Sequence, residues 1–131
     1  MTVPATTLLT LSHRGLDEAA ATTAPSQRYC LAHLAALRAA AAVLACRAAP
    51  AGSTETTRPR SRPRSAWVLL AKVAPELAEW AAFFAAGAQK RAAAEAGLRG
   101  VVTPREADDL LRDAQSFLSV IETTLQGRLA G

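Results

Sequence analysis

The stretch TPREADDLLRDAQSFLSVIETTLQ, residues 103–126, decides the fold class of this chain. It opens with Thr103 and places Glu106 three residues later, the spacing of a capping box at a helix start. Pro104 stands at the first helical position, where a missing N–H costs nothing. Apolar residues then recur every three or four positions, which predicts a long helix with one buried face. That face comprises Ala107, Leu110, Ala114, Phe117, Ile121 and Leu125.

Similar patterns predict further helices over about 5–22, 27–48, 66–73 and 75–96. Ser26 and Ser65 are suitable N-caps, and Gly97 is placed to end the helix over 75–96. No segment alternates apolar and polar residues as a strand does. We therefore expect an all-α fold, a four-helix up-and-down bundle with one short extra helix after a basic loop. The predicted core stripe of the second helix is Cys30, Leu34, Leu37, Ala41 and Leu44.

The length of 131 residues suits a single domain, residues 1–131. Residues 49–64 combine Pro, Thr and Arg with no large apolar side chain, so we expect a mobile Arg/Pro-rich loop there. The N-terminus has no signal-peptide pattern, and the most apolar stretch, 29–46, is interrupted by charge and dominated by Ala. These observations predict a cytoplasmic protein that is not inserted in a membrane.

The positive charge of the chain gathers in one place. The formal net charge is +4, and four arginines lie within seven residues: Arg58, Arg60, Arg62 and Arg64. A local basic cluster favours an anionic partner such as RNA, to which arginine binds through phosphates. The chain has only two Lys among 15 basic residues, so a general preference for Arg contributes to the cluster.

Motifs for nucleotide loops, catalytic serines and paired metal-binding histidines are missing from the sequence, and we expect no metal and no cofactor. The adjacent acids Asp108 and Asp109 point about 100° apart on a helix and do not converge. One pair is of interest, Arg28 and His33, at the spacing Arg-x4-His. Five residues turn a helix by about 140°, so on one helix these two side chains diverge, and a structural role for both is the expectation.

Four stretches of the chain resemble a HEPN domain of an actinobacterial type. They are Arg28–Ala39, Arg64–Trp67, Val73–Ala81 and Arg105–Leu111, and the resemblance covers most of residues 8–125. It implies a small helical bundle, commonly a homodimer, with a bacterial toxin or defence context and a theme of RNA cleavage, RNA binding or nucleotide-linked partners. The Arg-x4-His spacing is similar to the HEPN ribonuclease signature, which would make His33 the acid/base group and Arg28 the stabiliser of phosphoryl charge.

Three functions remain open at this point. The leading hypothesis is a HEPN-like module that binds RNA or nucleotides through Arg58, Arg60, Arg62, Arg64, Arg28 and His33, without assigned catalytic residues. The second is a metal-independent ribonuclease that uses Arg28 and His33. The third is a non-catalytic interaction subunit of a nucleotidyltransferase-type partner, which would dock on an exposed apolar patch that includes the off-stripe residue Phe83. Separately, a homodimer is expected to form through the helix that carries Trp80 and Phe83. Whether the chain is an enzyme therefore stays undecided by its sequence.

Overall fold

The computed structural model describes residues 3–47 and 65–130, with side chains up to residue 126. The described residues form helices and no strand, so the all-α prediction is confirmed. The Arg/Pro-rich stretch expected at 49–64, up to and including Arg64, lies outside the described residues. The helices are α1 (Ala5–Ala21), α2 (Pro25–Arg47), α3 (Ala66–Val73), the 3₁₀ turn η2 (Pro75–Leu77), α4 (Ala78–Ala86), α5 (Ala88–Glu95) and α6 (Pro104–Ala130).

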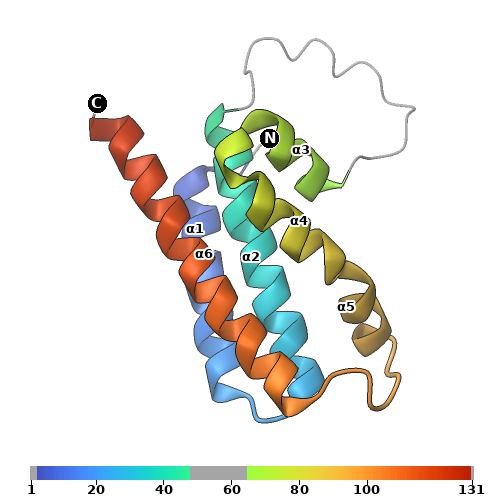
Figure 1. Cartoon of the computed structure of the whole chain (residues 1–131). Helices are drawn as coiled ribbons and strands as arrows, with labels where there is room; N and C mark the ends of the chain where they lie inside the picture. The colour runs from blue at the N-terminus through green and yellow to red at the C-terminus, as the bar shows by residue number, and fades with distance from the viewer. Residues whose placement is uncertain (1–2, 48–64, 131) are drawn as a thin grey trace.

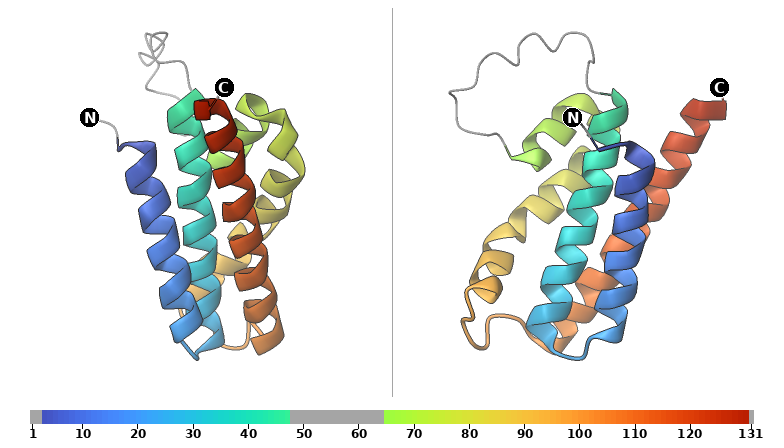
Figure 2. Two further views of the ribbon diagram at one scale, coloured as in Figure 1. Left: turned by 90° about the vertical axis from the view of Figure 1, so that its left-hand side faces the viewer. Right: turned by 180° about the vertical axis from the view of Figure 1, so that it is seen from behind.

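Helix α2 is the centre of the bundle. It packs against α1, α6, α3 and α5, and the three long helices α1, α2 and α6 run side by side (Figure 1). The two further views in Figure 2 show α4 and α5 descending along another side of α2, where together they take the place of a fourth helix. The predicted bundle with a short extra helix, α3, is thus confirmed.

The buried face of α2 differs from the predicted stripe. A face of small residues is fully buried, whereas all five residues of the predicted stripe are only partly buried: Cys30, Leu34, Leu37, Ala41 and Leu44. Because α2 has neighbours on several sides, small side chains let these helices approach closely. A Cβ on Gly15 of α1 would lie 3.3 Å from the Ala35 Cβ, and Ser12 Oγ donates a hydrogen bond to the Ala35 carbonyl at 2.8 Å. The buried small residues of α2 are Ala32, Ala35, Ala36, Ala39, Ala40 and Ala42.

The predicted helix ends are largely confirmed. Glu106 N–H donates to Thr103 Oγ1 at 3.0 Å and Thr103 N–H donates to Glu106 Oε1 at 2.9 Å, which completes the capping box. Ser65 Oγ accepts from the N–H of Trp67 at the start of α3. Gly97 follows the last turn of α5 with φ +86°, a conformation suited to glycine. The expected cap Ser26 is wrong, because α2 already begins at Pro25.

The predicted helix over 75–96 is wrong in one respect, since it divides into η2, α4 and α5. The division between α4 and α5 falls at Gly87. A Cβ at this position would lie 2.7 Å from the Tyr29 hydroxyl oxygen, closer than real contacts allow. Gly87 therefore lets the Tyr29 side chain of α2 approach the backbone of the α4–α5 arm.

The large side chains of the core gather where α3, α4 and α6 meet α2. Trp67 stacks on Phe84 with ring centroids 5.2 Å apart, and Phe84 lies 4.9 Å from Phe117 of α6. All three of these rings are buried in the core. Of the described helices, α2 is long and apolar enough to cross a membrane by length and composition, and half of its most apolar window is buried inside the bundle.

Candidate functional site

The His33 side chain lies in the interior of the bundle. It is only 1% exposed. Its ring stacks on Tyr29 and meets Trp67 and Phe84 edge-on, with centroids 5.9–6.4 Å apart. Its Nε2 lies 2.8 Å from the carbonyl oxygen of Phe84. His33 therefore joins α2 to α4 inside an aromatic cluster.

The hydrogen bond to Phe84 fixes the protonation of His33. A carbonyl oxygen only accepts, so Nε2 carries the proton and donates it. The other ring nitrogen, Nδ1, is buried and has no hydrogen-bond partner among the described residues. Burial lowers the pKa of His33 below 6.5, although the bond to Phe84 acts in the opposite direction. A neutral, enclosed imidazole follows, and it presents no nitrogen to a ligand at the surface.

Arg28 is committed to the backbone of a neighbouring helix. Its Nε donates to the Ala19 carbonyl at 3.0 Å and its Nη2 to the Ala20 carbonyl at 3.2 Å. These carbonyls belong to the last turn of α1, which has no basic residue of its own. A cation there satisfies unpaired carbonyls and opposes the negative end of the helix dipole. Arg28 thus caps α1 from α2.

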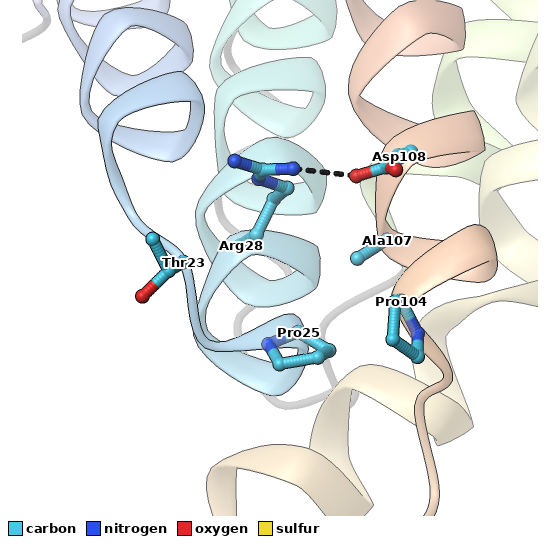
Figure 3. Close-up of a pocket in the computed structure, with 6 residues that line it drawn as sticks. All are labelled: Thr23, Pro25, Arg28, Pro104, Ala107 and Asp108. Carbon is cyan, nitrogen blue, oxygen red and sulfur yellow. Dashed lines mark hydrogen bonds and ion pairs between the residues drawn. The ribbon is translucent and has the colours of Figure 1, made fainter.

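A third interaction turns Arg28 toward α6. Its Nη1 lies 2.5 Å from Asp108 Oδ1, as the dashed line in Figure 3 shows. The two residues border a crevice of about 240 Å³ between the first turns of α2 and α6, with Thr23, Pro25, Pro104 and Ala107. Ligand pockets usually have about 300–1,000 Å³, so this crevice is small. The guanidinium points to Asp108 and away from the two prolines (Figure 3).

The structure does not bring Arg28 and His33 to one site within a chain. Arg28 binds α1 and α6 at the start of α2, whereas His33 lies about 1.4 turns further along and faces the aromatic core. An acid/base catalyst must reach the proton that it transfers. In the part of the chain that is described, the pair holds helices together and does not form a phosphodiester-cleaving arrangement.

The structure does contain two adjoining pockets that no motif in the sequence indicates. The first, of about 340 Å³, is lined by Glu79, Trp80, Phe83 and Asp113 and is called here the Trp80 pocket. The second, of about 270 Å³, shares Phe83 and Asp113 with it and is called the Tyr29 pocket. It is further lined by Tyr29, Lys90, Glu106, Asp109 and Leu110. Both pockets lie between the α4–α5 arm and α6.

The two pockets are rich in carboxylates. Burial raises the pKa of Asp113, and the neighbouring charge of Asp109 raises it further. The Lys90 ammonium, in the Tyr29 pocket, is bound by Glu106 and by the Val101 carbonyl, each at 3.0 Å. Across residues 3–47 and 65–126, no group of three or more His, Cys, Asp or Glu side chains is arranged to hold a metal ion. What these pockets offer is negative charge beside aromatic rings.

Comparison with known proteins places the chain in a family. Searches of curated proteins and of solved structures returned no match. A family model described as SAV_6107-like HEPN matches residues 19–122, a range that begins near the end of α1 and includes most of α6. Because the match covers well over half of the sequence, this chain belongs to the SAV_6107-like HEPN family.

Proposed function

We propose that this chain is a non-catalytic HEPN module that binds RNA or a nucleotide without cleaving it. The observation that supports this most strongly is the enclosure of His33. Its one N–H is given to the Phe84 carbonyl, and its ring is 1% exposed. The Arg28 guanidinium is similarly occupied by two carbonyls and Asp108. Neither side chain is free to act on a phosphodiester.

The distribution of charge suggests where phosphates would bind. Residues 48–64 hold four Arg and one Glu, so three of the four net positive charges of the chain belong to them. The remaining sequence is close to neutral, and many cations of the described helices are paired with acids, as in Arg47–Glu76 and Lys90–Glu106. The leading candidates for phosphate contacts are accordingly the four arginines of this segment, Arg58, Arg60, Arg62 and Arg64.

Binding is tested by fluorescence anisotropy with a labelled single-stranded RNA over a series of salt concentrations. Each phosphate contact contributes about 0.7 to the slope of log K against log salt for a single strand. Replacing the four arginines by Ser should therefore flatten the slope by up to about three units. The matched control replaces Arg14, Arg38, Lys72 and Arg99, which form no ion pair with another described residue, and should change the slope much less. Equal loss in both variants would contradict the assignment.

Cleavage is tested on the same RNA with a 5′ label and gel separation. Wild-type protein should leave the RNA intact over hours. Turnover that disappears in His33→Ala, with helical content unchanged by circular dichroism, would establish the ribonuclease alternative. Turnover that survives His33→Ala would point to a contaminating nuclease.

A protein-interaction role is the second candidate, and one observation favours it. The Phe83 side chain is 46% exposed beside the Trp80 pocket, although it is large and apolar. A single exposed apolar residue is common on protein surfaces, but this ring lies beside the second aromatic ring of the pocket, Trp80, and aromatic residues are enriched at protein–protein contacts. The sequence-based expectations of a nucleotidyltransferase-type partner and of a homodimer both use this residue. The solution mass of the purified wild type and of Phe83→Glu distinguishes the two alternatives. A homodimer should be seen in the wild type and should dissociate in the variant, whereas docking on a different protein would leave the mass of the purified chain unchanged.

A further inference from the structure

The Trp80 pocket combines two chemical elements on facing helices. From α4 it has the rings of Trp80 and Phe83 and the carboxylate of Glu79, and from α6 the carboxylate of Asp113. Trp80 is fixed from behind, stacked on Phe84 at 6.2 Å and tilted against Phe117 at 5.3 Å. Phe83 also contacts Phe84, edge-on at 5.0 Å. The aromatic side of the pocket therefore rests on the core and is held in position.

The carboxylates of the Trp80 pocket have no direct cationic partner among the described residues. Neither Glu79 nor Asp113 forms a hydrogen bond or an ion pair with another described residue. Arg112, the neighbour of Asp113 in the sequence, is paired with Asp109 at 3.2 Å, and its charge acts on Asp113 only from a distance, where it lowers the pKa of that carboxyl. The nearby Lys90 is held by Glu106. The pocket thus has negative charge that no cation of the described helices binds directly.

We infer that the Trp80 pocket binds the cationic side chain, Arg or Lys, of a partner protein. A cation gains energy from the face of an aromatic ring and from a carboxylate at the same time. The volume of about 340 Å³ is at the low end for ligand pockets, which suits a single side chain. The carboxylates repel phosphates, so this pocket is separate from any RNA-binding surface. The inference does not depend on the proposed RNA binding.

The exposed half of the Phe83 ring indicates that the cation belongs to a protein and is not a free amine. A small amine in the pocket would leave this ring in water. An apolar residue next to the Arg or Lys of a partner segment would cover it, with a gain of roughly 25 cal/mol for each Å² of apolar surface removed from water. The adjoining Tyr29 pocket, which also includes Phe83, extends the surface for such a segment.

The inference is tested by NMR on uniformly ¹⁵N-labelled wild-type protein, with the Trp80 indole N–H as the reporter. Three probes are titrated: Nα-acetyl-arginine amide, the neutral citrulline analogue, and an acetylated peptide amide in which Leu flanks Arg. The arginine amide should shift the Trp80 signal saturably, and citrulline should bind about tenfold more weakly because it lacks the charge. The Leu-flanked peptide should bind about threefold or more tightly than arginine amide, with the gain lost in Phe83→Ser.

Variants with one carboxylate changed locate the site. Asp113→Asn and Glu79→Gln should each weaken arginine amide about threefold or more. The matched control is Asp17→Asn on α1, which removes the same charge at an exposed position outside both pockets and should have no effect. Equal binding of citrulline, or equal loss in Asp17→Asn, would overturn the inference. Equal affinity for the peptide and for arginine amide would also overturn it, and so would a shift of the Trp80 signal on addition of RNA. A shift of the Trp80 signal with protein concentration alone would overturn it too, because it would assign the surface to a second copy of this chain.

Discussion

Arg28→Ala tests the structural role assigned to this arginine. The substitution removes the side chain that caps the last turn of α1 and pairs with α6. It leaves the carbonyls of Ala19 and Ala20 without these donors and leaves Asp108 unpaired. If Arg28 stabilises the packing of α1, α2 and α6, the variant must have a lower free energy of unfolding. If it served only phosphoryl chemistry, stability would be unchanged.

The size of the loss follows from the burial of each group. The Arg28 side chain is 22% exposed, so its bonds to the two carbonyls are partly shielded from water. Ala19 is buried, but its carbonyl also accepts from the Thr22 N–H at 3.2 Å, and Ala20 is exposed. We estimate about 1.5 kcal/mol for the carbonyl bonds. The partner Asp108 is 51% exposed, and its pair adds about 0.5 kcal/mol.

Thermal unfolding followed by circular dichroism measures this loss. A total of about 2 kcal/mol corresponds to a fall in Tm of about 6–10 °C for a chain of this length. Asp108→Asn, the matched control, removes only the exposed ion pair and should lower Tm by about 1–3 °C. Arg28→Lys should lie between the two, because one ammonium cannot reproduce the fork of donors. A Tm of Arg28→Ala within about 1 °C of wild type would refute the capping role.

Three further predictions concern other contacts of the bundle. Burial lowers the pKa of His33 below 6.5 in the folded chain, so as the pH falls the unfolded chain binds the proton before the folded chain does. The free energy of unfolding of the wild type should therefore fall as the pH drops below about 6.5. His33→Gln, which still donates to the same carbonyl, should flatten that slope in urea titrations at several pH values. Gly87→Ala should lower the free energy of unfolding by about 1–2 kcal/mol, because the added Cβ collides with the Tyr29 hydroxyl. In a Tyr29→Phe background the same substitution should be neutral or stabilising, and a double-mutant cycle of chemical unfolding measures the difference. Thr103→Ala should lower the free energy of unfolding by about 1 kcal/mol in the same assay, because it breaks the capping box. Unchanged stability would show that the capping box does not stabilise the fold.

The elements that could be predicted from sequence are those with a local signal. The capping box at Thr103 and the stripe of α6 involve residues at most four positions apart, so their spacing in the sequence is enough to predict the local structure. The buried face of α2 could not be predicted in this way. Alanines occur on every side of that helix, and only its neighbours determine which of them are buried.

The candidate site was less accessible to sequence reasoning because its partners are distant in the chain. Arg28 meets Asp108 across 80 positions, and His33 meets Phe84 across 51. The Arg-x4-His spacing therefore carried no information on what either side chain contacts. The Trp80 pocket joins residues of α4 and α6, which no periodicity within one helix connects. The exposed position of Phe83, in contrast, was indicated by its place off the α4 stripe.

The alanine face of α2 also bears on how this protein tolerates change. At Ala32, Ala36 or Ala39, nearly every substitution other than glycine adds atoms where neighbouring helices leave little space. Glycine would fit, but it weakens the helix by about 1 kcal/mol. The volume of the residue, more than its hydrophobicity, is therefore what natural variation must preserve there. A stretch whose composition looks repetitive and permissive is, position by position, among the least replaceable parts of the chain.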